Sequence, residues 1–345
     1  MKKDIAFIAM GQCGGNIGLL LEKRGYNVLH VNTSSEDLAT LREAKHTYHI
    51  KDGEGCGKDR DKAKELILND FAAILEQINQ KLKEKYIYVI FSSGGGSGSG
   101  GSPLLIDLLI QQTDKKVGAI TVLPSSTESP KTAINAYECF AELEGIDGIG
   151  NTFALDNNKD DKFLINKNFV DLFDSLMDIP QHQSIEGNID AEELKIMLST
   201  KGATIISKTT KATSTTAKTI RSFKENIFAP PETDRVIKYI GLSASTPINT
   251  DEIMRETGEC LDVFRGINTE NTICIFCGLT LPYAALEKIK EKIIENQELV
   301  SRSLNATTET RLSGGLDFLP QIKQPQPQNK DSVDEVLAKY MRKKS

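Results

Sequence analysis

In the first half of the chain, short apolar runs alternate with longer segments in which apolar residues recur every three or four positions. The short runs are Ile5–Ala9, Asn27–Val31, Tyr86–Phe91, Val117–Leu123 and Asn151–Leu155. Each is about as long as a buried strand, and the segments between them have the period of amphipathic helices. Strands that alternate with helices form parallel sheets with both faces covered. The pattern predicts an α/β fold.

The second half of the chain mixes the same two kinds of element. Apolar spacing from Ile165 to Leu176 predicts a helix. Further strands, with helices between them, are predicted at Ala203–Ser207, Val236–Ser243 and Thr272–Leu279. Segment Pro282–Leu304 carries its apolar residues along one stripe, which predicts a long amphipathic helix. We expect a second, smaller α/β domain with a mixed sheet.

The composition changes near the C-terminus. Residues Pro320–Asn329 are rich in proline and glutamine, as is typical of a linker that builds no core. The segment after it has Ser332 and Glu335 at capping-box spacing, keeps its apolar residues on one face and is basic at its end. We expect a basic amphipathic helix that docks on a partner. A helix that packs back on the body is the alternative.

Bulk composition narrows the class of protein. With 345 residues the chain can hold two packed domains. No apolar run is long enough to span a bilayer and no signal-peptide pattern opens the chain, so we expect a cytoplasmic protein. The net charge of −6 argues against direct binding of DNA by the folded part of the chain. The six cysteines are scattered, as in a reducing compartment, and Cys274 and Cys277 are expected to be small core residues of a strand.

The segment Gly94–Gly100 reads GGGSGSG and directly follows a predicted strand. Consecutive glycines let backbone N–H groups turn toward one anion, and the positive end of a following helix favours the same anion. We expect Ser102 to cap that helix and Pro103 to lie in its first turn. The loop is shaped to hold phosphate, although it is no Walker loop because no Lys-Ser/Thr pair follows. A flexible linker is the alternative.

Two motifs together resemble those of the tubulin/FtsZ family. The run GGGSGSG differs by one Thr-to-Ser change from the family signature GGGTGSG. Residues Gly11–Asn16 read GQCGGN after the first strand, which is similar to GQCGNQ in tubulins and GGGGGN in FtsZ. Alone this second motif is weak, and at Cys13 and Asn16 it departs from the dinucleotide-binding GxGxxG. The resemblance covers about residues 1–304.

The resemblance implies a fold and a division of the chain. The implied fold is a Rossmann-type parallel-sheet GTPase domain, a long central helix and a smaller mixed-sheet α/β C-terminal domain. The GTP-binding domain would span residues 1–164, and the central helix with the start of the catalytic loop would span 165–188. The C-terminal activation domain would span 189–305, with its long helix from 282, and the extension with linker and tail would span 306–345.

The resemblance also implies a site for GTP or GDP with Mg²⁺. The expected nucleotide-binding residues are Gly11, Gln12, Cys13, Gly14, Gly15, Asn16, Asn32, Gly55, Cys56, Gly57, Lys58, Gly94, Gly95, Gly96, Ser97, Gly98, Ser99, Gly100, Glu128, Asn157 and Asn168. Among these, Glu128 would contact the ribose, and Asn157 and Asn168 would read the base, with Asn166 as second choice for Asn168. Gln12 and Glu54 would hold Mg²⁺, through water. A packing role is the alternative for Cys13, and a solvated surface position is the alternative for Lys58.

Catalysis is expected at the foot of the central helix. There FtsZ has the sequence NVDFAD and this chain has Asn188-Ile-Asp190-Ala-Glu-Glu193. The resemblance implies that Asn188, Asp190 and Glu193 complete the nucleotide site of a neighbouring subunit, so that hydrolysis requires assembly. Carboxylates three residues apart on a starting helix face the same way and can orient a water molecule. The alternative is a capping box, and one residue can serve both roles.

We identify the chain as a GTP-dependent filament protein of this family. Its basic tail, its long helix and its GQCGGN loop resemble the TubZ group, which segregates plasmid and phage DNA. That likeness implies a polar head-to-tail filament in the cytoplasm of a bacterial host, without membrane contact. The filament would touch DNA only indirectly, through a TubR-like adaptor that binds the tail. A divergent FtsZ-type cell-division filament is one alternative. A monomeric dinucleotide enzyme is another, although it would need glycine at Cys13 and an acid at Asn32.

Overall fold

The protein is described by a computed structural model that covers residues 1–182, 184–232 and 236–308. Residues Met1–Ile293 form one compact unit. A second unit begins at Ile294, and of it only the rest of one helix is described. The predicted linker and basic tail helix lie outside the described residues. Among the described helices, none is both long and apolar enough to cross a bilayer.

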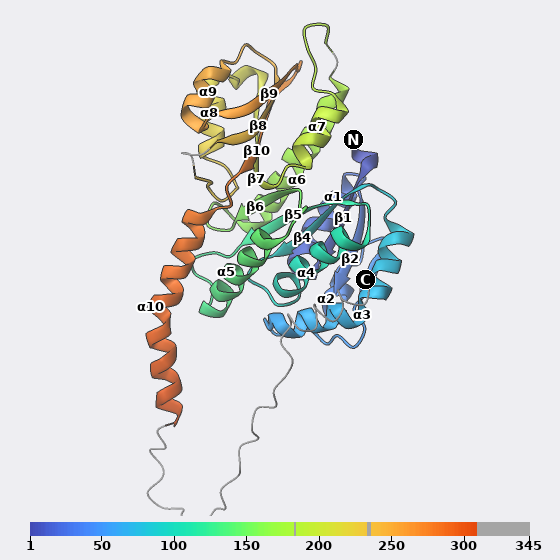
Figure 1. The fold of residues 1–345 in the computed structure, drawn as a ribbon, viewed down its shortest axis with the longest axis vertical. Coiled ribbons are helices and arrows are strands. Elements are labelled where there is room, and N and C mark those ends of the chain that lie inside the picture. Colours follow the sequence, from blue (N-terminus) through green and yellow to red (C-terminus); the bar gives the residue numbers. More distant parts are fainter. Residues whose placement is uncertain (183, 233–235, 309–345) are drawn as a thin grey trace, which may run out of the picture. The chain divides into compact units, whose positions relative to one another are not determined.

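Within the described residues, ten strands form one sheet in the order β3-β2-β1-β4-β5-β6-β7-β10-β8-β9 (Figure 1). The strands are β1 (Ile5–Met10), β2 (Asn27–Asn32), β3 (Thr47–His49), β4 (Tyr86–Ser92), β5 (Lys116–Leu123), β6 (Asn151–Asp156), β7 (Gly202–Thr210), β8 (Ile237–Ala244), β9 (Cys260–Ile267) and β10 (Asn271–Leu279). Neighbours from β3 to β7 are parallel. Strand β10 is antiparallel to β7 and β8, and β9 is parallel to β8. The predicted parallel sheet with a smaller mixed part is confirmed.

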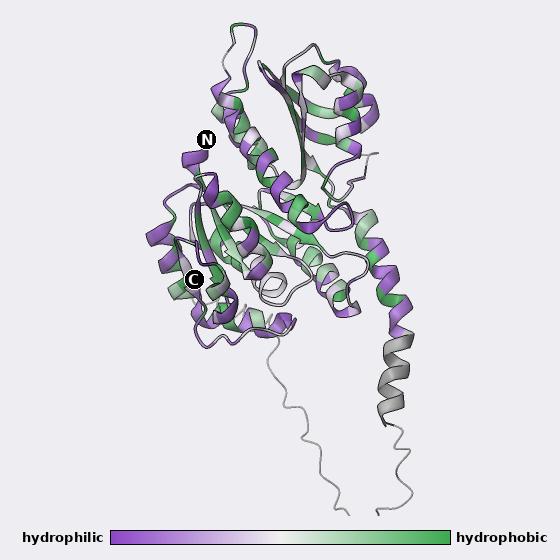
Figure 2. Ribbon diagram, turned by 180° about the vertical axis from the view of Figure 1, so that it is seen from behind, coloured by the Kyte–Doolittle hydropathy of each residue, from purple (hydrophilic) through white to green (hydrophobic). Residues whose placement is uncertain are grey.

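The helices follow the predicted alternation with the strands. They are α1 (Gly11–Lys23), α2 (Ser35–Thr40), α3 (Arg60–Lys81), α4 (Ser97–Gln112), α5 (Pro130–Gly145), α6 (Lys162–Asp178), α7 (Ala191–Leu198), α8 (Thr216–Lys224), α9 (Thr250–Thr257) and α10 (Tyr283–Thr308). Figure 2 shows apolar strands between helices whose outer faces are polar. Strands β6 and β7 pair across the predicted domain division, so the sheet is continuous. The four-part division of the chain stays a prediction.

A cluster of buried aromatic rings fixes α6 across the sheet. Phe173 of α6 lies 5.5 Å from Phe7 of β1 and 5.8 Å from Phe153 of β6, measured between ring centroids. All three side chains are fully buried. Such edge-on ring contacts add to the burial of large apolar areas, so they hold the helix in one register. Helix α6 therefore connects the carboxyl ends of the parallel strands to their amino ends in a fixed position.

The two ends of α6 lie at opposite edges of the parallel sheet. The helix follows the carboxyl end of β6, and its 17 residues rise about 25 Å. At its far end, Lys2 Nζ lies 2.7 Å from Asp174 Oδ1 and 3.8 Å from Asp178 Oδ1. Lys2 directly precedes β1, so the end of α6 lies beside the amino ends of the parallel strands. Helix α7 follows from this edge after a turn-rich loop.

Helix α4 begins earlier than the sequence predicts. Its first residue is Ser97, with Gly96 at the N-cap, so the expected cap at Ser102 and first-turn place for Pro103 are wrong. The early start brings α4 against α3: a Cβ atom at Gly100 would lie 2.4 Å from the carbonyl oxygen of Arg60. Only glycine permits this approach. The helix therefore starts inside the glycine run itself.

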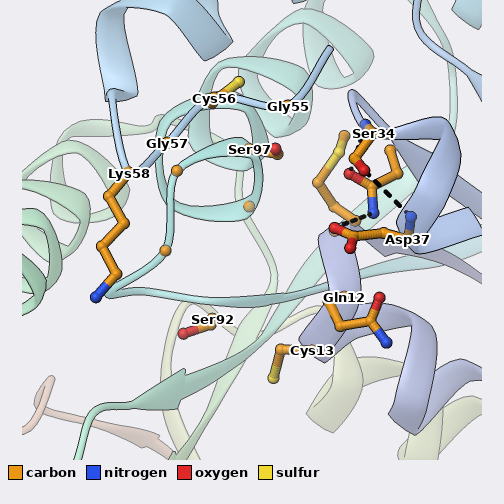
Figure 3. Close-up of a pocket in the computed structure, with 16 residues that line it drawn as sticks. Gln12, Cys13, Ser34, Asp37, Gly55, Cys56, Gly57, Lys58, Ser92 and Ser97 are labelled. Carbon is orange, nitrogen blue, oxygen red and sulfur yellow. Dashed lines mark hydrogen bonds between the residues drawn. The ribbon is translucent and has the colours of Figure 1, made fainter. Parts of the chain in front are cut away.

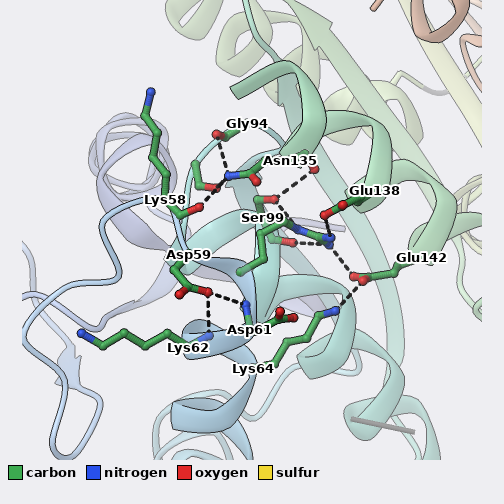
Figure 4. A network of polar contacts seen from close by, with 12 residues as sticks. Lys58, Asp59, Asp61, Lys62, Lys64, Gly94, Ser99, Asn135, Glu138 and Glu142 are labelled. Carbon is green, nitrogen blue, oxygen red and sulfur yellow. Dashed lines mark hydrogen bonds and ion pairs between the residues drawn. The ribbon is translucent and has the colours of Figure 1, made fainter. Parts of the chain in front are cut away.

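Pro103 has no N–H, so the carbonyl of Ser99 loses its usual helical partner. Arg60 replaces it: Nη2 donates to Ser99 O at 3.2 Å, and Nε donates to Ser99 Oγ at 2.9 Å. The same buried guanidinium lies 2.9 Å from Glu138 and 2.6 Å from Glu142 of α5 (Figure 4). Arg60 thus joins α3, α4 and α5 behind the glycine loop.

Arg60→Ala is expected to lower the free energy of unfolding by about 2 kcal/mol, because a buried carbonyl loses its donor and two carboxylates lose their shared cation. Thermal unfolding followed by circular dichroism measures the change. Arg221→Ala is the matched control, since Arg221 pairs with Glu225 on the exposed surface of α8. Equal shifts in the two variants would contradict a structural role for the Arg60 network.

The CxxC sequence of β10 is confirmed as core. Cys274 and Cys277 are both fully buried, and burial raises the pKa of each thiol well above its usual range. A neutral, inaccessible thiol is a poor metal ligand and a poor nucleophile. The pair contributes packing in the mixed part of the sheet.

Candidate functional site

Loops that follow β1, β2, β3 and β4 surround a cavity of about 470 Å³ (Figure 3). These strands are neighbours and parallel, so their carboxyl ends meet at one edge. The cavity is lined by Met10, Gly11, Gln12, Cys13, Asn32, Ser34, Asp37, Gly55, Cys56, Gly57, Lys58, Ser92, Gly95, Gly96, Ser97 and Gly98. Ligands of α/β sheets bind at this kind of edge. Twelve of the residues expected from sequence are brought together here.

The loop after β1 is short because α1 starts at once. Gly11 is the first helical residue and has φ +69°, a conformation that favours glycine. Gln12 and Cys13 follow it along the cavity wall. Gly14 does not line the cavity: a Cβ atom there would lie 2.3 Å from the carbonyl oxygen of Ile90 in β4. Gly15 packs against Leu41 instead, and Asn16 does not line the cavity either.

The glycine loop contributes its middle residues to the cavity. Gly95, Gly96, Ser97 and Gly98 line it, and Ser97 Oγ lies 2.6 Å from Thr33 Oγ1. The first N–H groups of α4 have no helical acceptors, so this helix start offers donors and a positive dipole end to an anion. The outer members Gly94, Ser99 and Gly100 face neighbouring elements rather than the cavity. These three are structural supports.

The loop before α3 forms the part of the wall next to the glycine loop. Gly55 and Gly57 have φ +80° and +52°, and Lys58 has φ +64°, which is rare for a residue with a side chain. Lys58 Nζ donates to Thr132 Oγ1 at 2.7 Å and to Ser129 Oγ at 3.3 Å, both at the start of α5. Lys58 thus lines the cavity with its ammonium group held by α5. Glu54 of the same loop is exposed and does not line the cavity.

Asp37 is an acidic residue of the cavity wall that the sequence motifs do not reveal. Asp37 Oδ2 accepts a hydrogen bond from Asn32 Nδ2 at 3.3 Å, and Asp37 N donates to Ser34 Oγ at 3.1 Å. The spacing of Ser34 and Asp37 is a helix-capping signal that predicts α2. That these side chains also line a cavity depends on the packing of α2 beside α1, which no local pattern reveals.

The donor set of the cavity fits Mg²⁺ in part. Asp37 offers a carboxylate, and Gln12 offers its amide oxygen while its Nε2 donates to Thr40 Oγ1 at 3.2 Å. Among the described residues, no cluster of three or more His, Cys, Asp or Glu side chains is placed to hold a metal ion. Magnesium commonly takes one or two carboxylates, waters and the phosphates of a substrate. This chain thus fits a nucleotide-bound Mg²⁺ at Gln12 and Asp37 better than at Glu54.

Cys13 is a neutral contact in this wall. Burial, and to a smaller extent the negative charge of Glu128, raise the pKa of its thiol to about 12. A thiol with this pKa is protonated at neutral pH, so it is neither a nucleophile nor a metal ligand. Glu128 itself lines an adjoining cavity with Asn158 and the first turns of α10.

The expected base readers are separated by the structure. Asn157 directly follows β6, and its Oδ1 is buried with no hydrogen-bond partner among the described residues. Asn168 is exposed and lines a different hollow, beside Ile206 and Ser207 of β7. Residues two apart on a helix point about 200° apart. Since Asn168 is on the exposed side of α6, Asn166 points inward and is buried. The two side chains therefore point to nearly opposite sides of α6.

The expected catalytic acids cap α7. Asp190 Oδ1 accepts from Glu193 N at 2.8 Å, and Asp190 N donates to Glu193 Oε2 at 3.0 Å, so the capping box is formed. Asn188 and Asp190 are exposed. These residues follow the far end of α6, whereas the cavity lies at the carboxyl ends of the strands. The chain therefore does not bring its own acids to its own cavity.

Comparison with known proteins gives consistent matches. The GTPase domain of the tubulin/FtsZ family matches residues 4–159. The tubulin-like protein TubZ of Clostridium botulinum C phage is 33% identical over 321 residues, which are 90% of this chain and 89% of the relative. The crystal structure of TubZ from C. botulinum phage c-st has a TM-score of 0.78 and 30% identity, over 87% of this chain and 100% of that chain. A GTPγS-form protofilament of Bacillus thuringiensis serovar israelensis TubZ has a TM-score of 0.73 and 19% identity, over 87% and 94%, a likeness of fold alone.

Proposed function

Because the chain belongs to the tubulin/FtsZ family of GTPases, we propose that it binds GTP in the cavity at the carboxyl edge of its sheet and assembles head to tail into filaments. The observation that carries the proposal is the position of two groups at opposite edges of one compact unit. Phosphate-binding loops lie at one edge, and the acids of α7 follow from the other. A neighbour stacked along this direction would place its acids over the cavity. The dinucleotide-enzyme alternative is excluded by the family.

In the proposed complex, N–H groups of Gly95, Gly96 and the start of α4 hold phosphates, and Ser97 adds a hydroxyl. Asn157, which directly follows β6 at the carboxyl end of the sheet, would read the base together with one asparagine of α6, either Asn168 or Asn166. Both asparagine amides can present a donor and an acceptor to a purine edge. Bound Mg²⁺ would neutralise phosphate charge, and Gln12 and Asp37 would hold it.

In the proposed reaction, Asp190 and Glu193 of the neighbouring subunit position the attacking water, and Asn188 lies beside them. Asp190 is exposed at the start of a helix, so its side chain can reach a neighbouring subunit and there accept a proton or orient a water molecule. The capping box fixes both carboxylates in one geometry, which lowers the cost of orienting the water. The capping and catalytic roles are therefore compatible.

Light scattering tests assembly directly. With GTP and Mg²⁺ we expect scattering to rise only above a threshold protein concentration, because a filament needs contacts between subunits. Adding GDP in place of GTP is the control. A flat trace at every concentration would remove the filament proposal.

We further propose that the filament moves DNA through an adaptor bound to the C-terminal tail. The support is the 33% identity to a phage TubZ and the basic amphipathic pattern after Ser332, which lies outside the described residues. Removal of residues after Asn329 is expected to leave polymerisation unchanged and to abolish adaptor binding. A pull-down with a TubR-like DNA-binding protein measures this, and retained binding would refute the role of the tail.

A further inference from the structure

Asn135 lies on α5 directly behind the two loops that form the cavity walls. Its side chain is fully buried. Its Nδ2 group donates to the carbonyl oxygens of Gly95 at 2.7 Å, Lys58 at 3.0 Å and Gly94 at 3.4 Å (Figure 4). A single amide therefore holds the glycine loop and the loop before α3 together from the side opposite the cavity.

These hydrogen bonds set the direction of two peptide planes. In a trans peptide the carbonyl of one residue points opposite to the N–H of the next. With the carbonyls of Gly94 and Gly95 drawn toward α5, the N–H groups of Gly95 and Gly96 point away from α5. Both residues line the cavity. The arrangement is a row of N–H donors for an anion.

The oxygen of the Asn135 amide, in contrast to its nitrogen, does not stabilise the loops. Its Oδ1 is buried without a hydrogen-bond partner among the described residues, which is unfavourable. An apolar residue would avoid this cost if packing were the only requirement. The donor half is therefore the part that the site uses.

We infer that Asn135 is a positioning residue that sets both phosphate-binding loops for nucleotide. The inference rests on the proposed function. Asn135 lies behind the loops and touches no ligand, so its effect passes through the backbone of Gly95, Gly94 and Lys58. Loss of the donor frees these carbonyls to turn, and the loops then present fewer N–H groups to the phosphates.

The test compares GTP, GDP and guanosine as competitors of a fluorescent GTP analogue. Asn135→Ala is expected to weaken the binding of GTP and GDP at least tenfold and the binding of guanosine less than twofold. The reason is that only the phosphates contact these loops. Asn151→Ala is the matched control. Asn151 is also fully buried, accepts from Tyr88 Oη at 2.6 Å and has an unpartnered Nδ2, yet it touches neither loop. It should cost similar thermal stability and leave GTP affinity within twofold.

Asn135→Leu keeps the volume without the donor and replaces the alanine variant should that fail to fold. The inference is overturned if either folded variant binds GTP as tightly as the natural chain. It is also overturned if the affinity for guanosine falls as much as the affinity for GTP. A natural chain that binds no GTP is a different outcome, because it refutes the proposed function itself.

Discussion

Asp190→Asn is expected to lower GTP turnover in assembled protein by about a hundredfold or more while GTP affinity stays unchanged. The exchange removes the charge that orients or deprotonates the attacking water. Asparagine caps helices as well as aspartate does, so its side-chain oxygen can still accept from Glu193 N. Alanine would be a poorer choice, because loss of the cap costs about 1 kcal/mol by itself. Filaments of the variant should persist after assembly, since their GTP is not hydrolysed.

Glu192→Gln is the matched control for Asp190→Asn. Glu192 is exposed on the same helix, and its ion pair is with Lys195. This variant removes one negative charge from α7 without touching the capping box, so turnover should stay near that of the natural chain. Phosphate release and sedimentation measure turnover and assembly on the same samples. Normal turnover by Asp190→Asn, or equal loss in both variants, would refute the role of Asp190.

Gly96→Ala is expected to weaken GTP binding by about tenfold to a hundredfold, or ~1–3 kcal/mol, with little loss of folding. The added Cβ would lie 2.9 Å from Lys58 N and 3.0 Å from Cys56 Cβ, so the two cavity walls must move apart. One of these atoms is backbone and cannot turn aside as a flexible side chain does. Isothermal titration with GTP and Mg²⁺ measures the change.

Gly145→Ala is the control for Gly96→Ala. Gly145 ends α5, and no atom lies within 4 Å of an added Cβ. Its GTP affinity should equal that of the natural chain, and its stability should be the same or slightly higher, because alanine favours helices. Unchanged GTP affinity in Gly96→Ala would mean that the two loops do not act together on the nucleotide.

The regular elements follow from local pattern, whereas element starts depend on tertiary contacts. Apolar runs locate β1, β4 and β5 because strands buried on both faces have few polar positions. The start of α4 is not predictable in this way. Glycine has a low helix propensity, so the run at Gly94–Gly100 reads as a loop, and the contact with Arg60 that allows an early start is distant in sequence.

In the candidate site too, residues within sequence motifs are predictable, whereas residues brought in by tertiary packing are not. Motifs locate Gly11, Gly96 and Ser97 because phosphate loops need glycine in fixed places. The place of Asp37 in the cavity is not predictable from local sequence, because it depends on tertiary packing. Locally, Asp37 only follows the helix cap at Ser34. The choice between Asn166 and Asn168 depends on the rotational phase of α6, which the sequence leaves open to within a residue or two.

The most direct test of the shared site is GTP turnover per subunit measured across a dilution series. We expect almost no turnover below a threshold protein concentration and a constant rate per assembled subunit above it. Addition of Asp190→Asn protein that still binds GTP should lower the rate in proportion to its share of the filament. Turnover that is equal per subunit at every dilution would refute an active site shared between subunits, because a lone chain would then hold a complete one.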